Sequence, residues 1–178
     1  MLPPGHIAAG YIIGRAVAAY ANASPEYEHL LAFLGIVAGV IPDIDFIPFF
    51  FKHKSFKLKR GDSHRNYITH APLVWFLLGI SIYFLNYSSL VRYIGIVLWF
   101  GTWSHFLGDS LEYGIRWFWP FRNRYYSALP APSADTIEYE EGTIAFYWKY
   151  IRGVYFRSWT TWLEGALIIL ALFVFFFA

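Results

Sequence analysis

The chain has 178 residues, which is room for one domain, and 57% of them are hydrophobic, 22% aromatic and only 15% charged. Soluble domains usually contain roughly 45–50% apolar residues, so this composition is typical of a protein that resides in a lipid bilayer. The formal net charge of +2 argues against a nucleic-acid partner, and the lack of cysteine excludes disulfides and thiolate metal ligands.

The first two apolar stretches predict two membrane-spanning helices. Residues 6–23 are rich in Gly and Ala, which allows close helix packing, and Ser24 is expected to cap the next helix with Pro25 at its first position. The second stretch, residues 30–41, is expected to end where Pro42 breaks it. Its 12 residues would give ~18 Å of helix, less than the roughly 30 Å of a hydrocarbon core. The polar groups that follow are therefore expected in a cavity below the membrane surface.

Three further stretches predict the remaining spans. Residues 71–85, with Thr69 as the expected helix cap, and residues 91–109 predict the third and fourth, and residues 162–178 predict the fifth. The expected fold is all-α: a polytopic membrane helix bundle with about five transmembrane spans in a single domain, residues 1–178. Within it, residues 1–124 form the core, residues 125–160 an interfacial segment rich in Tyr and Trp, and residues 161–178 a C-terminal transmembrane helix.

The distribution of basic residues predicts the orientation of the spans. The loop over residues 52–65 contains six Lys and Arg, whereas residues 24–29 contain none and residues 88–92 contain one. Because short basic loops remain in the cytoplasm, the N-terminus is expected inside and the C-terminus outside. The predicted location is the cell inner membrane, as a multi-pass protein.

With this topology, the ionisable groups that adjoin the apolar stretches all fall on the cytoplasmic side. Singly, each has an ordinary explanation, such as a helix cap or a surface residue like His53 in its basic loop. Together they indicate a functional site, because ionisable groups are costly in hydrocarbon. The predicted metal ligands are His6, Asp43, Asp45, His70, His105 and Asp109.

Imidazoles and carboxylates without thiolates suit a divalent metal, Zn foremost and otherwise Mn or Fe, as one ion or two. Such a metal makes hydroxide available as a nucleophile at neutral pH. Two neighbours are predicted to be catalytic. His64 is a candidate acid or further ligand, and Arg65 is a candidate binder of a phosphate oxygen. The metal site is expected at the cytoplasmic ends of four helices.

The order of these motifs resembles that of the YdjM-type inner-membrane proteins, which are described as membrane-bound metal-dependent hydrolases. The resemblance runs from residue 6 to about residue 121, and Gly5-His6 stands where the family usually has Thr-His. It implies a hydrolase reaction. The motifs that carry it are His6, Pro42-Asp43-Ile44-Asp45, His64-Arg65, Thr69-His70, Ser104-His105 with Asp109, and Phe118-Trp119-Pro120-Phe121.

The predicted function is a membrane-embedded metal-dependent hydrolase that acts on a phospholipid or other phosphoester at the cytoplasmic face. Membrane lipid is then both the environment and a candidate substrate, and the oligomeric state is left open. Two alternatives remain: a metal-ion or solute transporter, and a membrane scaffold with a structural metal. A transport path should place polar groups at several depths, whereas here they gather at one face.

Overall fold

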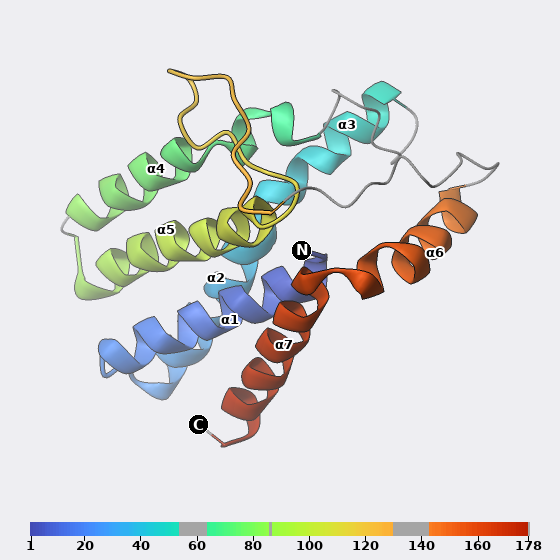
Figure 1. Ribbon diagram of the computed structural model, residues 1–178. Coiled ribbons are helices and arrows are strands. Elements are labelled where there is room, and N and C mark those ends of the chain that lie inside the picture. Colours follow the sequence, from blue (N-terminus) through green and yellow to red (C-terminus); the bar gives the residue numbers. More distant parts are fainter. Residues whose placement is uncertain (54–63, 86, 130–142, 178) are drawn as a thin grey trace.

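The computed structural model describes residues 1–53, 64–85, 87–129 and 143–177. Its regular elements are helices, which confirms the predicted all-α class (Figure 1). They are α1 (Pro3–Tyr20), α2 (Pro25–Val40), the 3-10 turn η1 (Ile41–Asp45), α3 (Phe46–His53), the 3-10 turns η2 (His64–Asn66) and η3 (Ile68–His70), α4 (Pro72–Phe84), α5 (Ser89–Ser110), α6 (Thr143–Gly153), η5 (Tyr155–Arg157) and α7 (Trp159–Phe177).

Two helical hairpins form the centre of the molecule. Helices α1 and α2 pair in one hairpin, α4 and α5 pair in the other, and α5 packs against both α1 and α2 (Figure 1). Helix α7 packs along α1. The start of α1, the end of α2, the start of α4 and the end of α5 therefore lie at one end of the bundle, which we call the site end.

Glycines set the distance between α1 and α2. Gly10 and Gly14 of α1 face Gly35 and Gly39 of α2, and a Cβ atom added to Gly10 would collide with the carbonyl oxygen of Gly35. Backbone can approach backbone this closely only where side chains are missing. Gly10 and Gly14 belong to the small residues from which close packing of the first span is predicted, and they lie at this contact.

The α-helical geometry of the second helix ends at Val40, next to Pro42 as predicted, but the chain does not leave the helical path. The chain tightens into η1 and then continues as α3, so the helical path runs over 28 residues from Pro25 to Lys52. A 3-10 turn tolerates a proline that lacks its N–H, because the proline lies at the beginning of the turn. The expectation of a short second helix is therefore wrong, and Asp43 and Asp45 belong to the interior of a long helical path.

The predicted helix caps are only partly correct. Helix α2 begins at Pro25 with Ser24 in the N-cap position, but the Ser24 side chain makes no capping hydrogen bond. The N-cap of α4 is Ala71, not Thr69. The Thr69 hydroxyl instead donates to Asp45 Oδ2 at 2.7 Å. The Thr69 hydroxyl therefore bonds to Asp45, a residue distant in sequence, and does not cap the start of α4.

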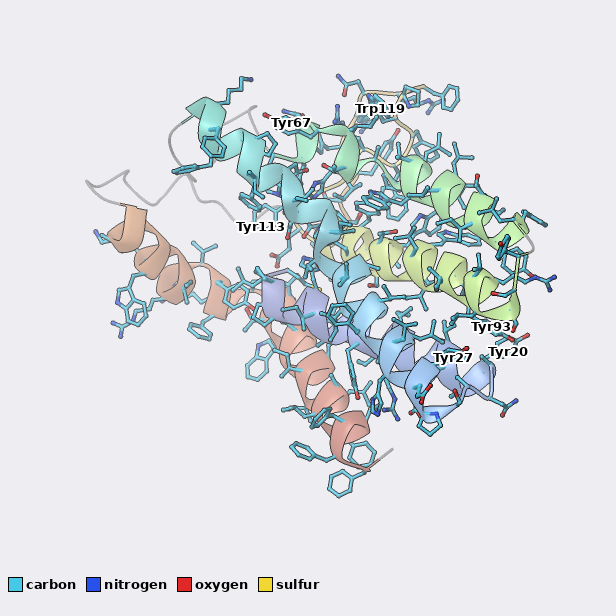
Figure 2. All side chains as sticks on the ribbon, turned by 180° about the vertical axis from the view of Figure 1, so that it is seen from behind. Tyr20, Tyr27, Tyr67, Tyr93, Tyr113 and Trp119 are labelled. Atoms are coloured by element: carbon cyan, nitrogen blue, oxygen red, sulfur yellow. The ribbon has the colours of Figure 1, made fainter. Side chains whose placement is uncertain are left out.

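Two helical stretches in the described part of the chain are long and apolar enough to cross a membrane, namely Pro25–Lys52 and Trp159–Phe177. Helix α4 is apolar but has only 13 residues. Aromatic side chains lie at both ends of the bundle: Tyr20, Tyr27 and Tyr93 at the far end, and Tyr67 and Trp119 toward the site end (Figure 2). Helix α6 lies in the predicted interfacial segment, of which residues 130–142 fall outside the described residues, as do most of the basic loop and the His53 side chain.

Candidate metal centre

The structure brings all the predicted site residues to the site end. His6 lies in the first turn of α1, Asp43 and Asp45 in η1, and His105 and Asp109 near the end of α5. The 3-10 turns η2 and η3 add His64, Arg65 and His70. Six of these side chains are at most 2% exposed: His6, Asp45, His64, His70, His105 and Asp109.

Four ligand atoms lie at the spacing of a metal coordination sphere. The Nε2 atoms of His64, His70 and His105 are each 3.6 Å from Asp43 Oδ1. The Nε2 atoms of His70 and His105 are 3.3 Å apart. In a tetrahedral zinc site with bonds of about 2.0–2.1 Å, neighbouring ligand atoms are about 3.3 Å apart. Four of the six edges between these atoms are thus close to those of such a tetrahedron, with slight contraction needed at Asp43.

Hydrogen bonds to the outer ring nitrogens orient two of these imidazoles. His70 Nδ1 bonds to Asp45 Oδ2, and His105 Nδ1 lies 2.9 Å from the carbonyl oxygen of Gly39. The carbonyl oxygen of Gly39 can only accept, so His105 carries its proton on Nδ1 and its Nε2 lone pair points toward Asp43. An ionised Asp45 would hold the proton of His70 on Nδ1 in the same way. A carboxylate or a carbonyl behind the ring is the usual partner of a metal-ligating histidine. Asp45, a predicted ligand, lies behind His70 through its Oδ2 atom. It also belongs, with Asp43, His64 and His70, to a group whose candidate ligand atoms all lie within 4.8 Å of one another.

A second group of candidate ligands adjoins the first. His6, His105 and Asp109 offer atoms that all lie within 4.8 Å of one another. His6 Nε2 is 3.4 Å from Asp109 Oδ1, and the His6 and His105 rings stack with centroids 3.9 Å apart. Asp109 Oδ2 is 3.9 Å from Nε2 of both His70 and His105. Asp109 thus connects the two groups, and the pair of groups offers room for one ion or two.

Several buried polar atoms at the site end lack hydrogen-bond partners, as the ligands of a cation would. His6 Nδ1, Asp45 Oδ1 and both ring nitrogens of His64 are buried and make no hydrogen bond. A buried polar atom left unpaired costs about 1–3 kcal/mol, so native structures rarely contain several in one place. A metal ion bound to His64 Nε2 would give one of these atoms its partner. The donor set, two imidazole-carboxylate groups without thiolate, fits a divalent metal.

Burial favours the neutral, metal-binding form of the imidazoles in η2 and η3. Loss of solvent is the main cause that lowers the pKa of His64, and it lowers the pKa of His70 to about 4. Both rings are therefore neutral at pH 7. A histidine must be neutral to bind a metal, so these two residues are ready to ligate without first losing a proton.

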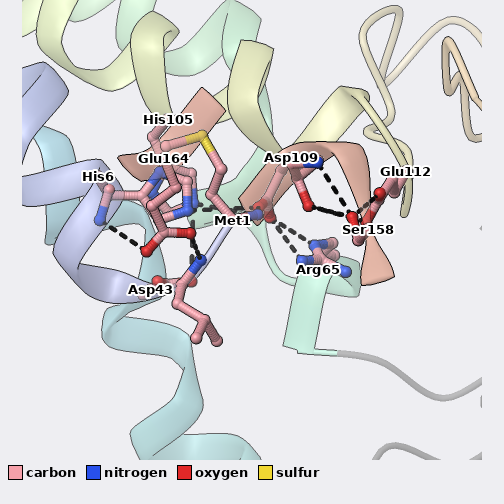
Figure 3. A network of polar contacts seen from close by, with 12 residues as sticks. Met1, His6, Asp43, Arg65, His105, Asp109, Glu112, Ser158 and Glu164 are labelled. Carbon is pink, nitrogen blue, oxygen red and sulfur yellow. Dashed lines mark hydrogen bonds and ion pairs between the residues drawn. The ribbon is translucent and has the colours of Figure 1, made fainter. Parts of the chain in front are cut away.

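Arg65 contacts a candidate ligand directly. Its Nε and Nη2 atoms both lie 2.7 Å from Asp109 Oδ2, and its guanidinium lies 5.0 Å from the ring centroid of Tyr113. Figure 3 shows Arg65 directed at Asp109. The nitrogen of Met1 approaches the other oxygen, Asp109 Oδ1, at 3.2 Å. Arg65 is thus placed beside the candidate centre, but its charge is paired with a carboxylate in this structure.

Two buried carboxylates at the site end have no counterpart in the sequence-based site. Glu164 of α7 accepts backbone hydrogen bonds from Leu2 and Gly5, and Glu112 accepts hydrogen bonds from the hydroxyls of Ser158 and Thr160. Glu164 does have a sequence signal, since it is the one charged residue of an otherwise apolar span. Glu112 has no such signal, because it lies in a mixed segment.

Among the described residues, the far end of the bundle has no matching cluster. In the part of the chain that the structure describes, the two groups of His and Asp at the site end are the ones that could hold a metal ion. The far end carries an Arg15–Glu28 ion pair at 2.5 Å and an exposed His29. The ionisable groups therefore gather at one end, as the sequence predicts.

The model of the YdjM inner membrane protein family matches residues 1–178, the whole chain, and the chain therefore belongs to that family. No curated protein and no solved structure matches it. The family is one of inner membrane proteins, in agreement with the predicted location.

Proposed function

We propose that this member of the YdjM inner membrane protein family is a metal-dependent hydrolase that acts on a phospholipid or other phosphoester at the cytoplasmic face. The observation that carries the proposal is the placement of three imidazole nitrogens at 3.6 Å from Asp43 Oδ1, with hydrogen bonds that orient His70 and His105. The bound metal, the hydrolytic reaction and the class of substrate are all part of the proposal.

In the proposal, a divalent ion, Zn foremost, binds Asp43, His64, His70 and His105. Asp45 then orients His70, and His6 and Asp109 form the second half of the centre, which would hold a second ion or complete the sphere of the first. A bound divalent metal would polarise a phosphoryl oxygen and supply an activated water as nucleophile.

Access to the centre is proposed on the Asp43 side. Its side chain is 21% exposed, whereas the imidazoles around it are buried. Arg65, 11% exposed, lies at the edge of the same cluster. A guanidinium pairs with a phosphate through two parallel hydrogen bonds, so Arg65 could exchange its contact with Asp109 for a phosphate of the substrate. His64 is then a ligand more than a proton donor, because its Nε2 faces Asp43.

In the proposed topology, the protein is one domain that crosses the membrane five times. The five spans are α1, the continuous stretch α2–α3, α4, α5 and α7. The N-terminus is cytoplasmic and the C-terminus outside, with α6 at the membrane interface. The supporting observation is that the ends of the four core helices that carry site residues meet at one end of the bundle. Arg65, at the described end of the basic loop, lies at that same end, which is the cytoplasmic side under the positive-inside rule.

The test is metal analysis and a substrate screen on protein purified in detergent. We expect about one or two equivalents of Zn, Mn or Fe, and hydrolysis of a phospholipid or a phosphoester. His105→Ala should lose metal and activity while it still inserts, because it removes a buried ligand. His29→Ala is the matched control, since His29 is exposed at the far end. Full metal content in His105→Ala would contradict the ligand assignment.

A structural metal is the second candidate function, favoured by the burial of the ligands and by their origin in separate segments of the chain. An ion held in this way would fasten α1, α2 and α5 together. In that case chelation would unfold the bundle, and no substrate would turn over. Ion flux into proteoliposomes would instead indicate transport, for which the far end offers no second cluster in the described residues.

A further inference from the structure

Helix α7 carries one ionisable side chain, and that side chain is bonded to the start of another helix. Glu164 is 3% exposed in an otherwise apolar helix. Its carboxylate accepts hydrogen bonds from the backbone N–H groups of Leu2 and Gly5, both at 3.1 Å, and from the hydroxyl of Tyr155. Burial of a carboxylate costs free energy unless the carboxylate accepts hydrogen bonds such as these.

The first turn of α1 has no cap of its own. Its N-cap residue is Leu2, which has no side-chain acceptor, and prolines occupy the next two positions. Gly5 leaves room for the carboxylate, because a Cβ atom there would lie 2.6 Å from Glu164 Cγ. The cap that a helix start requires is therefore supplied by α7.

This cap is next to a candidate metal ligand. His6 follows Gly5 and lies in the same turn, with its ring stacked on His105 (Figure 3). The N-terminus of a helix carries a partial positive charge, which opposes a cation nearby. The Glu164 charge offsets it at the turn that carries His6.

We propose that Glu164 is a positioning residue of the candidate metal centre. It fixes the first turn of α1 so that His6 faces Asp109, and it cancels the positive end of α1 so that His6, His105 and Asp109 accept a cation. Helix α7 thereby completes the centre in addition to crossing the membrane. The metal part of this inference rests on the proposed function.

The experiment compares Glu164→Gln with Glu112→Gln in the full chain. Glu112 is the matched control: it is 6% exposed, and its partners Ser158 and Thr160 are at the start of α7. Each change removes one buried carboxylate that is bonded at the site end, but the hydrogen bonds of Glu164 reach the start of α1, whereas those of Glu112 reach Ser158 and Thr160.

The first readout is titration with Co²⁺, whose absorption reports the ligands around it. We expect Glu164→Gln to bind about tenfold more weakly, within the range of a charge at a helix terminus, with an altered spectrum. Glu112→Gln should match the unmodified protein. In a His6→Ala background, Glu164→Gln should weaken binding less than it does in the unmodified protein, because the positioning of His6 no longer contributes and only the charge effect on His105 and Asp109 remains. An unchanged affinity and spectrum in Glu164→Gln, beside a clear loss in His6→Ala, would overturn the inference.

The second readout needs no metal. Hydrogen exchange of the amides of Leu2 and Gly5, which donate to Glu164, should rise in Glu164→Gln without added ion and stay constant in Glu112→Gln. Should Glu164→Gln fail to fold, Tyr155→Phe removes one donor to the same carboxylate and should raise exchange at the same amides to a smaller extent. If the unmodified protein binds no Co²⁺, the proposed metal function fails. Unchanged exchange would then reject Glu164 as the cap, and raised exchange would retain it.

Discussion

Asp43 and Asp45 are two residues apart and carry the same functional group, yet they have different surroundings. Asp43 faces three imidazole nitrogens, whereas Asp45 bonds to the outer nitrogen of His70 and to the hydroxyl of Thr69. The 3-10 turn that carries them turns about 120° per residue, so side chains two apart point in different directions. Under the proposed function, the first carboxylate is a ligand and the second orients a ligand through its Oδ2 atom.

This division predicts the effect of a change at residue 45. Asp45→Ala should weaken metal binding by about 10–100-fold, because the ring of His70 loses the partner that fixes its orientation. Asp45→Asn keeps an oxygen acceptor and should lose less. Competition of each variant with a chromogenic chelator measures the affinity. A Co²⁺ spectrum in Asp45→Asn that indicates one ligand fewer would instead identify Asp45 as a direct ligand.

At the scale of elements, the contact of α1 with α2 positions the two halves of the centre. His6 begins α1, and η1 follows α2, so a shift between these helices moves His6 relative to Asp43. The contact depends on glycine at Gly10 and Gly35, where backbone meets backbone. The closest packing in the hairpin therefore lies about one turn from His6 along α1.

Gly10→Val should separate the hairpin. Overpacking typically costs about 1–3 kcal/mol, so we expect lower thermal stability in detergent and reduced metal content. Gly165→Ala is the control, because a Cβ atom at Gly165 has nothing within 4 Å. Thermal unfolding and elemental analysis of both variants measure the effect. Equal stability and equal metal content in Gly10→Val and Gly165→Ala would show that the contact does not position the centre.

At the scale of the whole molecule, the buried ionisable side chains are concentrated at the site end. The candidate centre, Arg65 and Glu164 lie at the site end, and the far end carries the Arg15–Glu28 pair. If the site end is cytoplasmic, residues 22–28 lie outside and residues 111–129 lie inside. The natural chain lacks cysteine, so single cysteines report this directly.

Glu26→Cys and Arg122→Cys place thiols at exposed positions of opposite ends. In intact spheroplasts, a membrane-impermeant maleimide should label Glu26→Cys and leave Arg122→Cys unlabelled until the cells are opened, because charged reagents do not cross hydrocarbon. Gel-shift of the labelled protein measures the difference. The reverse pattern would invert the proposed orientation, and labelling of both from one side would exclude an odd number of spans between them.

Much of this architecture follows from the sequence by itself. The apolar stretches identify the helices, and Pro25 marks the first residue of α2. Counting chain reversals also predicts that His6, His70 and His105 lie at one end. These features depend on composition and on order along the chain, which local physics and a bilayer of fixed thickness translate into helices and their directions.

The tertiary structure alone decided which atom faces which. The continuous helical path through Pro42, the hydrogen bond of Thr69 to Asp45, the pairing of Arg65 with Asp109 and the cap that Glu164 provides each join residues distant in sequence or override a local preference. Such contacts depend on how each helix is rotated and how deeply it packs. Those quantities result from the side chains of all neighbouring helices at once, and no single segment of the sequence contains them.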